Sequence, residues 1–243
     1  MAPKPIRPQD MIEQAAKAFE GYVRFRRDLR SAFIQMVHAW TIALRNAVEP
    51  RDQQWQEREQ EWETIKTQIG PEGEQIYALC LGKITLACQA DYGDWLGNLY
   101  QRLSANLTGM GQHFTPFEIS RLGAALTMDQ NSVEGHIAEQ GYVTAHEPTC
   151  GSGGMVIAAA MRMRELGFNP ATQFRAFAGD LDRTCVEMTY VQCRLMGIAC
   201  WVQHVNSLDP SSGDEFNYRL ATPEFVGQIQ AELMAASPES KAA

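Results

Sequence analysis

The residues best suited to chemistry lie in AHEPTCGSGGMVIAAA, from Ala145 to Ala160. A short strand-like segment runs into an acid, Glu147, and then into three glycines, Gly151, Gly153 and Gly154. Glycine lets the backbone turn tightly and approach a ligand closely, where a side chain would collide. A strand, a glycine turn and a helix in this order are typical of nucleotide-binding folds, although an ordinary tight turn has the same composition. By itself the stretch indicates a candidate ligand cradle.

Two later segments carry polar residues at equivalent places. GDLD follows a strand candidate and offers Asp180, with Asp182 as the alternate, to the vicinal hydroxyls of a ribose. NSLD follows the next strand candidate, and the amide of Asn206 offers one donor and one acceptor to a purine edge. Three consecutive strand ends that carry a glycine turn, an acid and an amide predict an adenosine-containing cofactor.

The order of the turn departs from the dinucleotide fingerprint. That fingerprint opens as G-x-G-x-x-G directly into a helix, whereas here Glu147 precedes the glycines. A carboxylate attracts a sulfonium and its amino-acid tail, but it repels a pyrophosphate. S-adenosylmethionine is therefore the first expected cofactor, and a nicotinamide or flavin dinucleotide is the second.

The elements that must position these residues alternate between strands and helices. Strand candidates cover 141–146, 174–179 and 201–206, and helix candidates cover Met155–Leu166 and Cys185–Met196. This alternation predicts parallel βαβ units. The fold class expected is α/β, with a helical N-terminal region in front of an incomplete Rossmann-like core.

The first hundred residues have helical periodicity. Apolar spacing predicts one long helix from a capping box at Asp10 to Val48, and a polar helix that Gly70 and Pro71 stop. Two more helices are expected over Glu74–Cys88 and Asp94–Leu103. The predicted parts are the helical region 1–108, the core 109–220, and a C-terminal helix and flexible tail over 221–243.

Composition narrows the class of protein. The chain has 243 residues, 45% of them hydrophobic, and a formal net charge of -8, which argues against a surface coated for nucleic acid. The cluster Arg24, Arg26, Arg27 and Arg30 is interpreted as a solvated helix face rather than a phosphate-contacting patch. No window is apolar enough for a membrane span and no secretion signal opens the chain, so a cytoplasmic protein is expected.

The six cysteines do not form a metal site. None of them stand at the two-residue spacing of a metal knuckle, so no metal is expected and buried, reduced thiols are predicted. Cys150 lies within the glycine turn, but no basic neighbour stabilises a thiolate there. A packing role is therefore expected for it.

Four motifs together resemble a known family. DWLGNLYQRLS (Asp94–Ser104), GQHFTPFEISRL (Gly111–Leu122), EPTCGSGGMVIAA and GDLD are similar to motifs of the adenine-N6 DNA methyltransferases. Within that family the chain resembles the modification subunits of type I restriction systems and related plasmid or phage methylases, over roughly residues 90 to 210. The resemblance implies a Rossmann-like, S-adenosylmethionine-dependent fold and a role in DNA methylation of the restriction-modification type.

The resemblance also implies residue roles. Phe114, Thr115 and Pro116 match the segment that closes over the methionine end of the cofactor, and Glu147 matches the acid that holds the methionine amino group. Asp180 matches the ribose-binding acid, where the family more often has Glu, and Asn206 falls where it commonly has Asp facing the adenine. The complete expected cofactor-binding set is Phe114, Thr115, Pro116, Glu147, Thr149, Gly151, Gly153, Asp180, Leu181 and Asn206.

The family's transfer motif is missing from the sequence. That motif is Asn or Asp, then Pro-Pro, then an aromatic, at the end of a fourth strand, and this sequence contains no Pro-Pro pair. NPAT from Asn169 and DPSS from Asp209 imitate it, but neither has the aromatic or the correct position needed to grip an extruded base. No catalytic residue is therefore assigned.

The resemblance also leads us to expect that the Rossmann-like core stops before the fourth strand of the family's sheet. Its first strand would then be an open edge, covered by the N-terminal helices, a second copy of the chain or a partner.

The leading hypothesis is an S-adenosylmethionine-binding adenine DNA methyltransferase unit that needs a partner chain for catalysis and target recognition. The alternative is a catalytically inactive binding or regulatory protein that interacts with DNA or with restriction-modification subunits. A methyltransferase for a small molecule or a protein is disfavoured by the HFTP segment.

Overall fold

The computed structural model describes residues 7–24, 28–104, 113–209 and 217–236. The chain forms two compact units, Met1–Thr115 and Pro116–Ala243, which are treated separately below. The boundary expected after residue 108 falls within 105–112, outside the described residues. No helix in the described part of the chain is long and apolar enough to cross a membrane.

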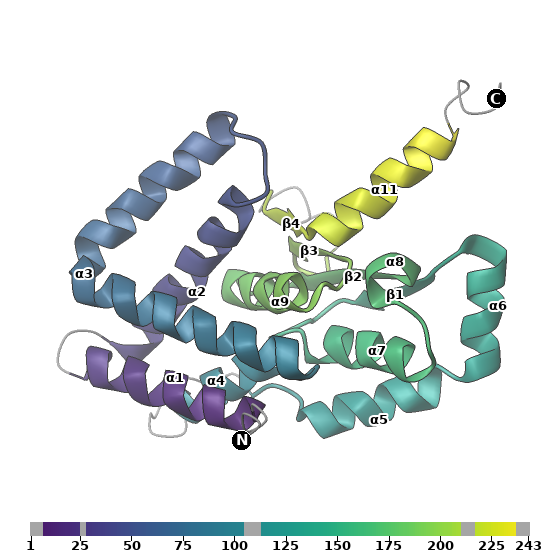
Figure 1. Ribbon diagram of the computed structural model, residues 1–243, viewed down its shortest axis with the longest axis horizontal. Coiled ribbons are helices and arrows are strands. Elements are labelled where there is room, and N and C mark those ends of the chain that lie inside the picture. Colours follow the sequence, from purple (N-terminus) through teal and green to yellow (C-terminus); the bar gives the residue numbers. More distant parts are fainter. Residues whose placement is uncertain (1–6, 25–27, 105–112, 210–216, 237–243) are drawn as a thin grey trace, which may run out of the picture. The chain divides into compact units, whose positions relative to one another are not determined.

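The first unit is helical (Figure 1). Its helices are α1 (Pro8–Val23), α2 (Leu29–Asn46), α3 (Gln53–Ala90) and α4 (Trp95–Ser104). Their buried faces form a core that includes Phe19, Phe33, Met36, Tyr77, Ile84, Leu96, Leu99 and Leu103.

The single helix predicted from Asp10 to Val48 is wrong, because two helices occupy this segment. The Asp28 carboxylate accepts the Ser31 N–H at 2.8 Å and so caps the start of α2. Because the apolar spacing continues through both helices, it does not reveal the break between them. The start of α1 also differs, since Arg7 is its N-cap and Asp10 lies in its first turn. Arg26 and Arg27 of the basic cluster lie outside the described residues.

The break predicted at Gly70 is confirmed as a kink within α3. Gly70 adopts φ 68° and ψ 177°, and the backbone is helical on both sides of it. The Tyr22 hydroxyl donates to the Ile69 carbonyl at 3.0 Å, directly before the kink. The two predicted helices are thus consecutive segments of one bent element.

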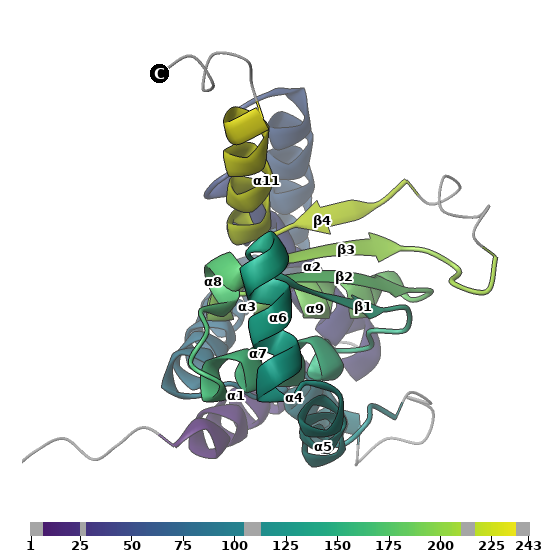
Figure 2. The same cartoon turned by 90° about the vertical axis from the view of Figure 1, so that its right-hand side faces the viewer.

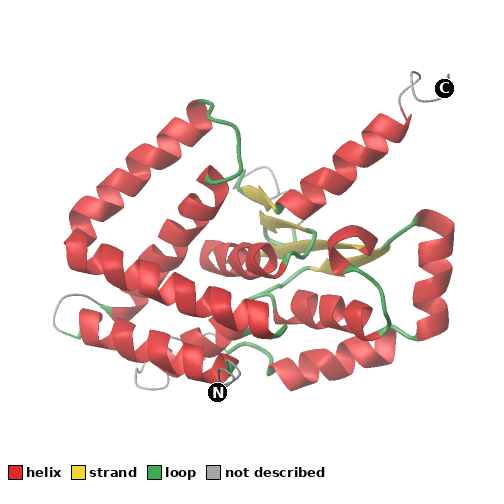
Figure 3. Cartoon of the chain, viewed as in Figure 1, coloured by secondary structure: helices red, strands yellow, loops and turns green. Residues whose placement is uncertain are grey.

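The second unit contains a small sheet with helices around it (Figures 2 and 3). Its elements are α5 (Phe117–Thr127), α6 (Gln130–Gln140), β1 (Val143–Glu147), α7 (Gly154–Glu165), α8 (Pro170–Gln173), β2 (Phe174–Asp180), α9 (Arg183–Met196), β3 (Cys200–His204), β4 (Arg219–Ala221) and α11 (Pro223–Ala236). The three predicted strands and both crossover helices are confirmed to within two residues, and the predicted C-terminal helix is present as α11. Sequence patterns did not reveal α5, α6, α8 or β4.

The sheet has the order β1-β2-β3-β4. The first three strands are parallel and β4 is antiparallel to β3. In register, Glu147 lies opposite Ala178, and Asp180 lies opposite His204. The carboxyl ends of the three parallel strands therefore meet at one edge, as in the first half of a Rossmann-like fold.

Candidate functional site

The glycine turn is fixed to the end of β2 by backbone and carboxylate hydrogen bonds. The Cys150 N–H donates to the Gly179 carbonyl at 2.8 Å, and the Gly151 N–H donates to Asp180 Oδ2 at 2.8 Å. The other carboxylate oxygen, Oδ1, accepts the Asp182 N–H at 2.9 Å. Asp180 thereby joins the turn after β1 to the turn after β2.

Helix α9 holds the turn from its other side. The Thr189 hydroxyl donates to the Gly151 carbonyl at 3.1 Å, and the Gln192 amide donates to the Ser152 carbonyl at 2.7 Å. Both side chains are 0% exposed, so these bonds satisfy groups that cannot reach water. Sequence reasoning missed both residues, although they stand three positions apart in a segment, Met188 to Cys193, whose other residues are apolar, which was a usable signal.

Gly153 is required where the turn meets α9. Its φ is +99°, and a Cβ added there would lie 3.2 Å from Thr189 Oγ1 and 3.3 Å from Thr189 Cα. An L side chain is thus disfavoured both by the backbone conformation and by the space available. This close contact explains why a glycine stands at the start of α7.

Cys150 has the environment of a structural thiol. It is buried beneath the turn, and the Thr189 hydroxyl lies 3.3 Å from its Sγ. Burial is the main cause that raises its pKa far above the ordinary value for a cysteine. The thiol therefore stays neutral at physiological pH and contributes packing.

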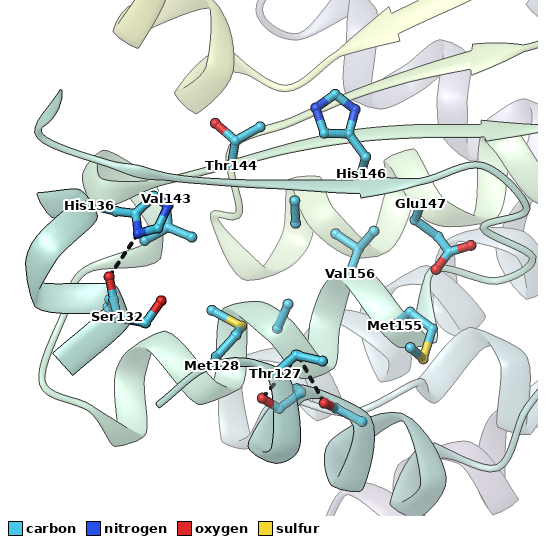
Figure 4. A pocket seen from close by; sticks show the side chains of 15 residues that line it. Thr127, Met128, Ser132, His136, Val143, Thr144, His146, Glu147, Met155 and Val156 are labelled. Carbon is cyan, nitrogen blue, oxygen red and sulfur yellow. Dashed lines mark hydrogen bonds between the residues drawn. The ribbon is translucent and has the colours of Figure 1, made fainter. Parts of the chain in front are cut away.

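Glu147 ends β1 beside the turn. Its Oε1 accepts the Thr149 N–H at 3.1 Å and the Thr149 hydroxyl at 3.3 Å. The side chain also borders a cavity of about 400 Å³ between β1 and the helices α5, α6 and α7 (Figure 4). The carboxylate thus stands where the strand edge, the turn and the cavity meet.

The end of β3 is tied to the same place. The Ser207 hydroxyl donates to the Pro148 carbonyl, and the Val205 N–H donates to the Asp180 carbonyl at 2.9 Å. The Asn206 Oδ1 accepts the Leu208 N–H at 3.1 Å, so the acceptor expected to face a purine also stabilises the local turn.

Two exposed aliphatic side chains follow the second and third strands. Leu181 is 62% exposed and Leu208 is 96% exposed. Aliphatic side chains in such positions can pack against the face of a flat ring that binds at the strand ends.

The expected site residues are divided between the units. In the second unit, loops joined by the hydrogen bonds above bring together Glu147, Thr149, Gly151, Gly153, Asp180, Leu181 and Asn206. In the first unit, the ring of Phe114 lies 5.1 Å from that of Tyr100, and its carbonyl accepts the Gln101 amide at 3.2 Å. Thr115 is exposed at the end of that unit, and Pro116 is the N-cap of α5.

Comparison with known proteins found a family match over more than half of the chain. The model described as N-6 DNA Methylase matches residues 91–238, a range that contains every residue of the expected site. A search of curated proteins found no match.

Several solved structures are similar to the chain, at low identity. They include a putative class I S-adenosylmethionine-dependent methyltransferase from Listeria monocytogenes (TM-score 0.48, 13% identity, 83% of this chain) and the methyltransferase subunit of a type I restriction-modification system from Streptococcus thermophilus (0.43, 15%, 84%). A third is the DrdV–DNA complex (0.42, 16%, 93%). The matched regions cover 55%, 60% and 26% of those chains, respectively.

Proposed function

Because the chain belongs to the N-6 DNA methylase family, we propose that it binds S-adenosylmethionine and serves as a unit of an adenine-N6 DNA methyltransferase. The observation that carries the proposal is the convergence of Glu147, the glycine turn and Asp180 at the carboxyl edge of three parallel strands. In open α/β sheets this edge is where ligands bind.

The residues at the strand ends fit the parts of this cofactor. Each oxygen of Asp180 accepts one backbone N–H, and a carboxylate oxygen has a second acceptor position for a ribose hydroxyl. Leu181 and Leu208 supply apolar surface for an adenine ring, and Glu147 supplies a negative charge for an ammonium group. By resemblance, Phe114, Thr115 and Pro116 would close over the methionine end.

The residues of this chain would bind and orient the cofactor, while further groups would be needed to hold the adenine base that reacts. When bound, S-adenosylmethionine would supply an electrophilic methyl group on its sulfonium; an adenine amine would attack that carbon and lose a proton, and S-adenosylhomocysteine would leave. Glu147 and Asp180 would fix the two ends of the cofactor, so that the sulfonium has a defined position above the strand ends. Because these 243 residues contain no Pro-Pro pair, the groups that hold the adenine amine and recognise the target would come from outside them, and we propose a partner chain as their source.

A catalytically inactive protein is the second candidate. The missing Asn-Pro-Pro-aromatic motif favours a binding or regulatory role toward DNA or restriction-modification subunits. Both candidates use the same cofactor site, and they differ in whether a completed assembly transfers methyl groups.

A methyl-transfer assay with radiolabelled S-adenosylmethionine and DNA free of N6-methyladenine tests the proposal. We expect the chain alone to retain the cofactor in equilibrium dialysis and to transfer no label to the DNA. Transfer by the chain alone would show that no partner is required. Absence of retention at millimolar cofactor would overturn the cofactor assignment.

A further inference from the structure

The turn between β2 and α9 consists of Leu181 and Asp182. Asp182 is held by two hydrogen bonds, because its N–H donates to Asp180 Oδ1 at 2.9 Å and its Oδ1 accepts the Thr184 N–H at 2.8 Å. The side chain of Leu181 is 62% exposed, so little packing fixes its position. The place of this side chain is therefore set mainly by its backbone.

The backbone of Leu181 is held by a side chain from the neighbouring strand. His204, the last residue of β3, lies opposite Asp180 in the register, and its Nε2 lies 2.9 Å from the Leu181 carbonyl oxygen. Because a carbonyl oxygen only accepts hydrogen bonds, Nε2 is the donor. Imidazole donates from Nε2 both in one neutral tautomer and as imidazolium, so protonation of the ring preserves this bond.

The backbone around His204 is fixed on both sides. Its N–H donates to the Tyr218 carbonyl at 2.9 Å, directly before β4, and the N–H of Val205 donates to the Asp180 carbonyl at 2.9 Å. Strand β4 runs beside β3 along this segment (Figure 2). The imidazole is thus attached to a strand that has a hydrogen-bonded neighbour on either side.

A second set of contacts joins β4 to the helix that follows the turn. The Tyr218 hydroxyl donates to Glu187 Oε1 at 2.8 Å, and Arg183 Nε donates to the same oxygen at 3.0 Å. Glu187 is 2% exposed, so both bonds are shielded from water. The chain after β3 therefore supports the turn at two places, at Leu181 through His204 and at the start of α9 through Arg183.

We propose that His204 is a positioning residue, which holds the backbone of Leu181 so that the Leu181 side chain packs against the adenine ring of the cofactor. The identity of that ligand rests on the proposed function. His204 acts through Leu181 and need not touch the cofactor itself. It therefore contributes to affinity for the adenine end of the cofactor and not for the methionine end, which is assigned to Glu147.

Calorimetric titration of His204 variants with S-adenosylhomocysteine tests this role. We expect His204→Leu, which removes the donor, to weaken binding about three- to tenfold, the effect of losing one neutral hydrogen bond. His204→Gln should stay within about twofold of the parent, because its side-chain amide nitrogen can donate to the same carbonyl. Adenosine, measured by competition, should lose affinity by the same factor in His204→Leu, since it lacks the methionine end.

A double-mutant cycle with Leu181 separates positioning from a general effect on the fold. Leu181→Ala removes the side chain that His204 is proposed to place, so adding His204→Leu to it should change affinity by no more than about twofold. If the two substitutions instead weaken binding additively, His204 does not act through Leu181, and the proposal is overturned.

Hydrogen exchange tests the contact without any ligand. The Asp182 and Thr184 N–H groups are bonded within the turn and should exchange faster in His204→Leu than in the parent, because the turn opens more often. His136→Leu is the matched control, since this exposed imidazole also contacts a backbone carbonyl, that of Ser132 at 2.8 Å, but within α6. It should leave both the exchange at the turn and the ligand affinity unchanged.

Equal exchange at the turn in the parent and in His204→Leu would overturn the inference. A parent that binds neither S-adenosylmethionine nor S-adenosylhomocysteine contradicts the proposed function, and the role of His204 toward adenine with it. A parent that binds the cofactor, together with a His204→Leu variant that binds it equally well, contradicts this inference alone.

Discussion

Asp180 is the residue on which the account of the site depends most. Its carboxylate accepts N–H groups from two different turns and faces the place proposed for a ribose. Asp180→Asn replaces one acceptor oxygen by a donor, so one of these N–H groups loses its partner. We expect affinity for S-adenosylmethionine in calorimetry to fall roughly 10- to 100-fold, since a hydrogen bond to a charged group contributes about 1.5–3 kcal/mol.

Asp209→Asn is the matched control, because this exposed acid lies beyond the third strand end and has no proposed contact with the cofactor. Its affinity should equal that of the parent. Unchanged affinity in both Asp180→Asn and Glu147→Ala would contradict the assignment of the site.

Gly153 gives a stability prediction that is independent of any ligand. Gly153→Ala places a Cβ at φ +99° and within 3.3 Å of Thr189, so we expect a loss of at least about 1–2 kcal/mol in urea unfolding. Gly135→Ala in α6 is the control, since a Cβ there meets nothing within 4 Å. It should preserve or raise stability, by up to about 1 kcal/mol. Equal stability of the two variants would contradict the role given to Gly153.

At the scale of elements, Arg175 connects β2 to α11. The residue is 6% exposed. Its guanidinium contacts Glu232 at 2.7 and 3.0 Å, donates to Gln228 at 2.6 Å and lies 3.7 Å from the centre of the Tyr142 ring. We expect Arg175→Ala to lower the unfolding free energy by about 1–3 kcal/mol, because these contacts are lost together.

Hydrogen-exchange measurements should locate this loss of stability in α11, whose amides should exchange faster in Arg175→Ala than in the parent. Gln230→Ala is the control, because this exposed residue lies on the same helix. Protection of α11 equal to that in the parent would show that Arg175 does not anchor the helix.

The elements predicted correctly from the sequence are those whose hydrophobic pattern begins and ends close to where the element itself begins and ends. The strands β1, β2 and β3 end in turn residues, and α7 and α9 fit between them, so pattern and structure agree. The break before α2 depends on one local cap, Asp28, which apolar spacing does not report. The three-residue strand β4 forms by pairing with β3, and so short a segment carries little pattern of its own.

Within the site, the sequence indicated which residue types stand at the strand ends but not how they are connected. The bonds from Thr189 and Gln192 to the turn arise from the packing of α9 against a loop about forty residues earlier in the chain. The double use of Asp180 arises because the end of β2 lies beside the turn after β1. Such contacts depend on tertiary structure. They could not be predicted from spacing alone.

At the scale of the whole molecule, the buried thiols lead us to expect that the folded protein loses stability at alkaline pH. Burial raises the pKa of Cys80 and of Cys88 from 9.0 to about 12. Because the folded-state pKa is raised, the stabilisation is complete below pH 9 and is lost as pH rises toward 12. Urea unfolding should show a decline of up to about 1.4 kcal/mol per pH unit for each thiol above pH 9.

Cys80→Ala tests this cause directly. The variant should be less stable than the parent at pH 8, because a cavity forms, but it should lose less stability between pH 8 and pH 10.5. Equal losses in the two proteins would show that the thiol of Cys80 does not contribute to the alkaline transition.

The central claim is that the three strand ends form an S-adenosylmethionine site. Calorimetric titration of the purified chain, with S-adenosylhomocysteine as the comparison ligand, measures it most directly. We expect saturable binding with a Kd near micromolar, which corresponds to a binding free energy of about -8 kcal/mol. No heat of binding up to millimolar ligand, for either compound, would contradict it.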